Sequence, residues 1–347
     1  MAITTKSFGK TPDGTEVSLY TIQNDNGFTA EVTDLGAILV RLFVPDKAGQ
    51  TADVVLGYDS AEEYIKKGGF YGATVGPSAN RIDNASFIID GVKYQLAAND
   101  GTNNLHSDAH KGYHRRMWNA QLKDSSVVFT IEDADGSMGF PGNKKVQVTY
   151  TVTDDNELRI DYDVTSDRKT VINMTNHSFF NLTGHGSGNI EAHKLYIHAS
   201  KYTPVFERLI PTGELADVSG TPFDFRTMKT VGDDIDADDV QLGYGQGYDH
   251  NYVLDDFDGT LKKAASVEDP ASGRKMDVYT DQPGLQFYAG NCITPETGKG
   301  GAAYDKRSGL CLETQCFPNS VNQPGFQDVI YGPDRPYRTT TVYRFYN

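Results

Sequence analysis

Residues 145–152 read Lys-Val-Gln-Val-Thr-Tyr-Thr-Val, and residues 158–164 read Leu-Arg-Ile-Asp-Tyr-Asp-Val. In both runs apolar side chains alternate with polar ones, which is the period of a β-strand with one buried face. The segment between them contains Asp154, Asp155 and Asn156, residue types that favour tight turns. The two runs therefore predict an antiparallel pair of strands that lays one face on a hydrophobic core.

The same pattern recurs along the chain in short runs separated by turn residues. At residues 86–96 two such runs flank Asp90-Gly91, a dipeptide that suits a two-residue hairpin turn because both central positions need a positive φ. One short helix is expected at residues 60–67. Further strands are expected at residues 17–22, 29–32, 38–43, 127–131, 194–198, 275–280, 285–290 and 340–345.

No linker, repeat or low-complexity tract divides the 347 residues, and the 35 glycines fit a chain with many turns. We therefore predict an all-β fold, in which residues 1–347 form a single domain built as one large antiparallel β-sandwich. Functional residues are expected on the connections between its strands.

The formal net charge of the chain is −15. Such a surface repels nucleic acid, anionic lipid and phosphate-rich ligands, but it does not oppose a neutral ligand. No apolar run approaches the ~18 residues of a membrane span, and the first residues lack the basic-then-apolar pattern of a secretory signal. The three cysteines, an odd number, favour free thiols in a reducing compartment. We expect a cytoplasmic protein that binds neither nucleic acid nor a membrane.

Two patterns resemble known sites but lack part of what those sites need. His106, His110 and His114 follow one another at intervals of four, a spacing that would align zinc ligands on one face of a helix. The residues between them are polar and include Gly112, so a loop is the better interpretation. The glycine-rich residues 243–247 lack the Lys-Ser/Thr and the following helix of a phosphate loop. We reject nucleotide binding and expect no metal.

Five polar segments stand beside strand-like runs and carry residue types that perform acid–base chemistry or bind hydroxyl groups. Spacing alone leaves each one open, because a buried arginine often pairs with a carboxylate and a lone histidine is often structural. The segments are residues 80–82 with Asn80 and Arg81, residues 103–106 with His106, residues 176–184 with His177, residues 248–252 with Asp249, and residues 313–322 with Glu313.

Together these segments resemble those of the galactose mutarotase (aldose 1-epimerase) family. The resemblance runs from about residue 15 to residue 346. Its most specific parts are Asn-His-Ser-Phe-Phe-Asn-Leu at residues 176–182, and Glu-Thr-Gln at 313–315 followed by Pro-Asn-Ser-Val-Asn at 318–322. The resemblance implies the large antiparallel supersandwich of that family, in agreement with the strand pattern.

The resemblance also implies roles for individual residues. The implied reaction interconverts the α and β anomers of free aldohexoses such as D-galactose and D-glucose, and it needs no metal or cofactor. The partner is a small aldose sugar, and the protein is expected to be a monomer or a homodimer. The implied roles are general acid for His177, general base for Glu313, a second histidine at the ring for His106, hydrogen bonds to hydroxyls for Arg81 and Asp249, and lining of the site for Asn80 and Phe287.

Two departures from the family pattern lie near the expected sugar site. Pro77-Ser78 stand where members often carry an arginine and an aliphatic or aromatic residue. Ser107-Asp108 stand where members often carry two glycines after the histidine. Both departures bear on the preferred sugar more than on the reaction.

Three other functions stay open at this point. A hexose-6-phosphate epimerase of the same superfamily needs basic residues for the phosphate, and the local candidates are Lys111, Arg115 and Arg116. A non-catalytic carbohydrate-binding sandwich needs aromatic side chains but no acid–base pair. A glycoside hydrolase needs two carboxylates beside the scissile bond, which Asp249 and Glu313 offer, although a histidine with a glutamate fits an isomerisation better.

Overall fold

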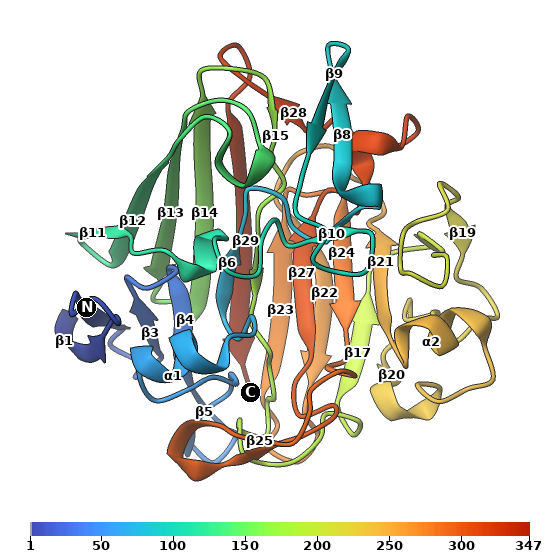
Figure 1. Ribbon diagram of the computed structural model, residues 1–347. Coiled ribbons are helices and arrows are strands. Elements are labelled where there is room, and N and C mark those ends of the chain that lie inside the picture. Colours follow the sequence, from blue (N-terminus) through green and yellow to red (C-terminus); the bar gives the residue numbers. More distant parts are fainter. Residues whose placement is uncertain (1) are drawn as a thin grey trace.

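The computed structural model describes residues 2–347, which fold mainly into antiparallel strands (Figure 1). Among these residues the largest sheet has nine strands, in the order β11-β12-β13-β14-β29-β23-β22-β17-β20. Their bounds are β11 (Asn119–Lys123), β12 (Ser126–Asp133), β13 (Lys144–Val152), β14 (Glu157–Ser166), β17 (Lys194–Ile197), β20 (Lys229–Thr230), β22 (Lys262–Glu268), β23 (Lys275–Thr280) and β29 (Tyr337–Tyr346).

The strand pair predicted from residues 145–164 lies within this sheet as β13 and β14. The two strands pair antiparallel, with Val148 opposite Tyr162. Along β13, buried residues alternate with more exposed ones, as in Val146, Gln147 and Val148. The alternation in the sequence therefore placed the apolar face of each strand correctly.

Two five-stranded sheets lie against the apolar face of the large sheet. Side chains of all three sheets meet in one continuous core, where Tyr20 contacts Phe129 and Phe28 contacts Phe345. The predicted antiparallel β-sandwich is thereby confirmed. The sheets contain β1 (Ala2–Lys10), β2 (Glu16–Gln23), β3 (Thr29–Thr33), β4 (Ile38–Pro45) and β5 (Thr51–Asp53) in one, and β19 (Ala216–Asp217), β18 (Lys201–Tyr202), β21 (Asp249–Val253), β24 (Gly284–Tyr288) and β27 (Cys311–Gln315) in the other.

Short strand pairs and single helical turns make up many of the connections. The hairpin predicted at residues 86–96 is β8–β9, with Asp90 at φ +50° and Gly91 at φ +78°. The pairs are β6 (Ala73–Val75) with β16 (Thr175–His177), β7 (Arg81–Ile82) with β10 (Asn104–Leu105), β8 (Ser86–Ile89) with β9 (Val92–Gln95), β15 (Thr170–Val171) with β28 (Ile330–Tyr331), and β25 (Glu296–Thr297) with β26 (Ala303–Tyr304). The 3₁₀ turns are Asp83–Ala85, Tyr113–Arg115, Ser137–Gly139, Val231–Asp233, Lys299–Gly301 and Ser320–Asn322.

Two short α-helices lie outside the sheets in the described part of the chain. The expected helix at residues 60–67 is α1 (Ala61–Lys67), and the side chain of Ser60 caps it. The other helix, α2 (Val240–Gly245), begins after Asp239, whose carboxylate caps its first turn. The sequence does not indicate α2, because glycine, present twice in it, is a poor helix former. No helix in residues 2–347 has the length and apolar character needed to cross a membrane.

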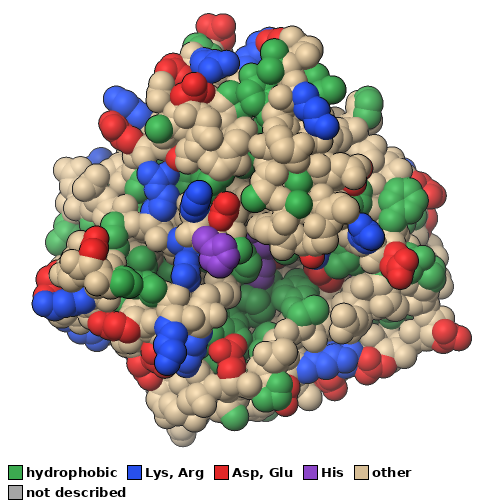
Figure 2. Space-filling model, in the orientation of Figure 1, with side chains coloured by type: hydrophobic (Ala, Val, Ile, Leu, Met, Phe, Trp, Pro, Cys, Tyr) green, Lys and Arg blue, Asp and Glu red, His purple; other side chains and the backbone are tan. Residues whose placement is uncertain are grey.

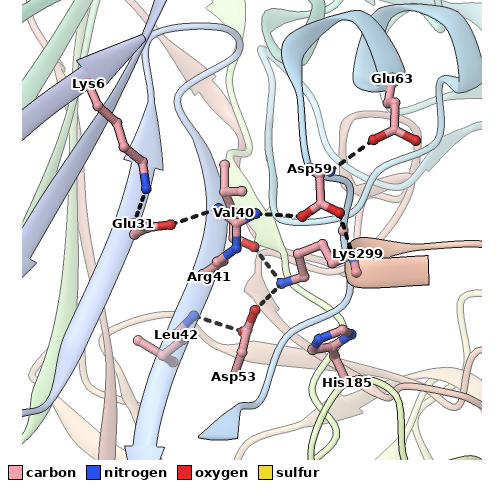
Figure 3. A network of polar contacts seen from close by, with 12 residues as sticks. Lys6, Glu31, Val40, Arg41, Leu42, Asp53, Asp59, Glu63, His185 and Lys299 are labelled. Atoms are coloured by element: carbon pink, nitrogen blue, oxygen red, sulfur yellow. Dashed lines mark hydrogen bonds and ion pairs between the residues drawn. The ribbon is translucent and has the colours of Figure 1, made fainter. Parts of the chain in front are cut away.

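A buried charged network fastens the loop after β25 to the N-terminal sheet (Figure 3). The ammonium group of Lys299 is almost fully buried, donates to the carbonyl of Val40 over 2.7 Å and pairs with Asp53. Beside it, Arg41 pairs with Glu31 at 2.7 Å and with Asp59 at 2.6 Å. Burying charges is tolerated only when they are paired, so this network holds the loop in one place.

Candidate active site

A cavity of about 460 Å³ opens on the face of β21, β24 and β27 that points away from the core. Successive side chains on a strand face opposite sides, so Asp249 and Glu313 reach the cavity while their neighbours enter the core. Figure 2 shows histidine side chains beside a hollow on this face. The cavity brings together six of the seven residues expected in the site: Asn80, Arg81, His106, His177, Asp249 and Glu313.

His177 and Glu313 are in direct contact in this cavity. The Nε2 atom of His177 lies 3.5 Å from the Oε1 atom of Glu313, and both side chains are buried. The Oε2 atom of Glu313 is buried and has no hydrogen-bond partner within residues 2–347. On the other side of the imidazole, Nδ1 lies 3.5 Å from the Sγ atom of Cys311, which is two residues before Glu313 on β27.

Burial shifts the pKa values of the pair in opposite directions. Loss of water lowers the pKa of His177 to about 4. Burial raises the pKa of Glu313 well above its usual value, an effect to which Asp249 adds and which Arg81 opposes. Between these two pKa values the pair therefore carries one titratable proton, which is on Glu313 while His177 is neutral. Transfer of that proton from Glu313 to His177 creates a base and an acid side by side.

His106 is held by two hydrogen bonds to Asn80. The backbone N–H of Asn80 donates to Nδ1 of His106 over 3.1 Å, and the backbone N–H of His106 donates to the carbonyl of Asn80 over 3.0 Å. Because a backbone N–H only donates, Nδ1 carries no proton, and the proton of the neutral ring is on Nε2. Burial, with the nearby His177, lowers the pKa of His106 well below its usual value. His106 is thus a neutral Nε2–H donor.

Arg81 and Asp249 bring charges of opposite sign to the cavity. The Nε atom of Arg81 donates to Asp100 over 2.7 Å, which orients the guanidinium group. Asp249 accepts a hydrogen bond of 2.7 Å from the side chain of Gln286, and burial raises the pKa of Asp249. The cavity therefore offers both donors and acceptors, which the recognition of hydroxyl groups requires.

Phe287 does not line the cavity, contrary to the expectation from the sequence. Its side chain is 0% exposed and stacks in the core on Tyr248, with ring centroids 5.1 Å apart. On β24 it lies between Gln286 and Tyr288, and the strand alternation sends it to the opposite face. The prediction therefore named the right strand but the wrong residue, since the next residue, Tyr288, lines the cavity.

Other aromatic side chains form the apolar walls. Phe179 stacks on the imidazole of His177 with ring centroids 4.9 Å apart. Phe70 lies 5.7 Å from the His177 ring and 4.7 Å from the His106 ring. These rings keep water away from both histidines, which is the physical cause of their lowered pKa values. Neither phenylalanine was predicted to line the site: Phe70 lies outside the polar segments, and Phe179 is an apolar residue within one of them.

The glycine-rich residues 243–247 contribute a wall, although they are not a phosphate loop. Tyr244 and Gly245 of α2 and the next residue, Gln246, line the cavity. The side chain of Asn291 donates to the carbonyls of Gly245 and Tyr248 over 3.1 and 2.9 Å, which anchors this turn beside β24. The sequence displays this concentration of glycine, but it does not indicate that the turn lines a cavity.

The histidines at positions 106, 110 and 114 do not gather around one point. His110 is exposed, and His114 packs on Phe70 outside the cavity lining. A different set has ligand-capable atoms within 4.8 Å of one another, namely His106, His177 and Glu313. In that set Nδ1 of His106 is already occupied by Asn80, and burial favours the uncharged form of Glu313 over the carboxylate that a cation needs.

Comparison with known proteins agrees with this geometry. A family model described as aldose 1-epimerase matches residues 18–344. The chain belongs to the aldose 1-epimerase family. Galactose mutarotase from Bos taurus is 41% identical over 349 residues, covering 99% of both chains. Aldose 1-epimerase from Escherichia coli K12 is 37% identical over 337 residues, covering 96% of both.

Solved structures of the aldose 1-epimerase family share the fold. An aldose epimerase homologue from C. elegans matches with a TM-score of 0.86 and 30% identity, over 95% of this chain and 99% of that one. Galactose 1-epimerase from Lactobacillus acidophilus matches with a TM-score of 0.86 and 28% identity, over 99% and 98%. The resemblance seen at residues 176–182 and 313–322 is thereby confirmed as membership of the aldose 1-epimerase family.

Proposed function

We propose that this aldose 1-epimerase interconverts the α and β anomers of free aldohexoses, including D-galactose and D-glucose, by proton transfers through His177 and Glu313. The observation that carries the proposal is the 3.5 Å contact between the two side chains inside a cavity with apolar walls. The ring oxygen and the C1 hydroxyl of a pyranose are bonded to the same carbon. Two neighbouring groups can therefore serve both oxygens at once.

Ring opening begins with Glu313 ionised and His177 protonated. Glu313 takes the proton of the C1 hydroxyl while His177 gives a proton to the ring oxygen, and the bond between C1 and the ring oxygen breaks. After rotation about C1–C2, His177 takes the proton of the C5 hydroxyl as this oxygen attacks C1, and Glu313 returns its proton to the C1 oxygen. Both residues end as they began. Each positioned transfer contributes roughly 10²–10⁴-fold in rate.

The remaining polar residues of the cavity are proposed to bind the sugar. His106 donates through Nε2–H to a ring hydroxyl, Arg81 donates through its guanidinium group, and Asp249 accepts. The positive charge of Arg81 also lowers the pKa of Glu313, which favours its ionised form. Asn80 acts through the hydrogen bond that orients His106.

The two arginines considered for a sugar phosphate are bonded elsewhere. Both Nη atoms of Arg115 donate to the carbonyls of Tyr64 and Ile65, and Arg116 pairs with Asp133 at 2.8 Å. Neither these two arginines nor Lys111 lines the cavity. Lys67 does line it, but its ammonium group pairs with Glu63 at 2.8 Å and donates to the carbonyl of Thr297 over 2.7 Å. A free aldose therefore fits better than a hexose 6-phosphate, and an acid–base pair in contact favours catalysis over mere carbohydrate binding.

We further propose a cytoplasmic monomer or homodimer that binds neither nucleic acid nor a membrane. The net charge of −15 supports the absence of nucleic-acid and membrane binding, because it repels polyanions. The cysteines support the cytoplasmic location, since Cys292, Cys311 and Cys316 are all free thiols.

Polarimetry of freshly dissolved α-D-galactose tests the proposed reaction. The first-order rate constant for the drift in optical rotation is expected to rise linearly with protein concentration. Galactose 6-phosphate, added at the concentration of the free sugar, is expected to compete weakly. A drift no faster than that in buffer refutes the function, and strong competition by the phosphate ester points to the hexose-6-phosphate reaction instead.

A further inference from the structure

We propose that Ser107 is a positioning residue, which holds the His106 ring at the angle needed to bind the sugar. This inference rests on the sugar-binding role of His106 proposed above. The Ser107 side chain is 0% exposed and lies outside the cavity lining, so it acts through its neighbours. Ser107 belongs to one of the two departures from the family pattern, Ser107-Asp108. Its hydroxyl contacts Ser78, which belongs to the other departure, Pro77-Ser78.

The hydroxyl of Ser107 bridges both polar backbone groups of Ser78. It accepts a hydrogen bond of 2.8 Å from the N–H of Ser78 and donates one of 2.9 Å to the carbonyl of the same residue. Two residues along, Asn80 exchanges its own pair of hydrogen bonds with His106. Residues 78–80 and 106–107 are therefore clasped by four hydrogen bonds, two of which depend on one hydroxyl.

The segment that receives the Ser107 hydroxyl is itself anchored to the rest of the site. Asn173 accepts a backbone hydrogen bond from Ala79 over 2.6 Å and donates one to Pro77 over 2.8 Å. The side chain of Asn173 then bonds both backbone groups of Cys316, which directly follows β27, at 3.0 and 2.9 Å. Because β27 carries Glu313, the clasp places the His106 ring in the same frame as the acid–base pair.

The backbone at Ser107 has a conformation that favours glycine over serine. His106 and Ser107 have left-handed angles, with φ of +53° and +67°. Such angles strain a residue with a side chain, whereas glycine adopts them freely. A serine at position 107 is thus unfavourable for the backbone alone, and the two hydrogen bonds of its hydroxyl offset this strain.

Loss of the clasp is expected to weaken sugar binding rather than proton transfer, since His106 is a neutral donor and the acid–base pair is not touched. Ser107→Ala is expected to raise KM for α-D-galactose by about three- to tenfold, the loss of one or two ordinary hydrogen bonds. The value of kcat is expected to stay within about twofold of wild type.

Ser107→Gly separates the hydroxyl from the backbone angle. Glycine relieves the strain but supplies no hydroxyl, so KM is expected to rise as in Ser107→Ala while the melting temperature is equal to or above that of the alanine variant. A wild-type KM in Ser107→Gly overturns the proposal. Ser166 offers a matched control, because its hydroxyl bridges both backbone groups of Arg168 at 2.7 and 3.4 Å outside the cavity lining. Ser166→Ala is expected to leave KM unchanged.

A double-mutant cycle tests whether Ser107 acts through His106. In a His106→Ala background, Ser107→Ala is expected to add less than about twofold to KM. An added rise as large as in wild type shows that the two residues are independent and refutes the positioning role. The wild-type protein in the same assay reports on the proposed function separately. If the wild-type protein catalyses mutarotation and Ser107→Ala has an unchanged KM, the positioning role of Ser107 is refuted while the proposed function stands.

Discussion

Replacing Glu313 by glutamine removes the proposed base while keeping its shape. The side chain is 2% exposed and lies 3.5 Å from His177, so an amide of equal size fits the same space. An amide does not accept the C1 proton, and the expected loss is roughly 10²–10⁴-fold in kcat, or about 3–5 kcal/mol in the barrier. Because position 313 is buried, bulk water does not easily replace the missing base.

Stability of the Glu313→Gln protein is expected to be at least that of wild type at neutral pH. Burial raises the pKa of Glu313 in the folded state above its unfolded value, so the favourable contribution of its carboxyl group is complete only below the unfolded pKa. That contribution is lost as pH rises through the folded pKa. A neutral amide avoids this loss, and a fall in rate therefore does not arise from unfolding.

The assay is polarimetry of fresh α-D-galactose, with circular dichroism to follow folding. Glu31→Gln is the matched control, because Glu31 is another buried glutamate that pairs with Arg41 and Lys6 outside the cavity lining. The control is expected to lose stability but to retain kcat. A Glu313→Gln protein with a rate within about threefold of wild type refutes the role of Glu313 as the base.

Three further outcomes follow from the site. In a plot of kcat/KM against pH, the fall on the acid side is expected near pH 4, where His177 gains a proton and the pair no longer contains a base. A fall near pH 6.5 would contradict the claim that burial lowers the pKa of His177. Exhaustive dialysis against a chelator is expected to leave the rate unchanged, and a lost rate that zinc restores argues for a metal at His106, His177 and Glu313. Because Phe287 packs in the core, Phe287→Leu is expected to lower the free energy of unfolding by about 1–2 kcal/mol and to leave KM unchanged. A raised KM at unchanged stability would show instead that Phe287 contacts the sugar.

The strands could be predicted wherever one face of the strand is buried and the other is exposed to solvent. Residues 145–164 alternate clearly, and they form β13 and β14 as expected. The N-terminal strand β1 and the helix α2 carry weaker local signals, since α2 depends on the cap at Asp239 and on packing that the sequence does not display. Local preference decides such short elements only together with tertiary contacts.

Polar residues beside strand-like runs marked the candidate segments, and the resemblance to the family then supplied their roles, because spacing alone left each segment open. Arg81, His177 and Glu313 come from three distant segments, yet all reach one cavity. The prediction for Phe287 was wrong because the sequence around it does not reveal which face of the strand turns inward, and a shift by one residue changes the face. The Ser107 clasp was not predictable, since hydrogen bonds between two loops depend on their folded geometry.

The orientation of a bound sugar tests the central claim most directly. We suggest a crystal structure of the Glu313→Gln protein with D-galactose, in which slow turnover preserves the complex. The account predicts the C1 hydroxyl within hydrogen-bond distance of the substituted side chain at position 313, and the ring oxygen within the same distance of Nε2 of His177. A pyranose with C1 turned away from both side chains contradicts it.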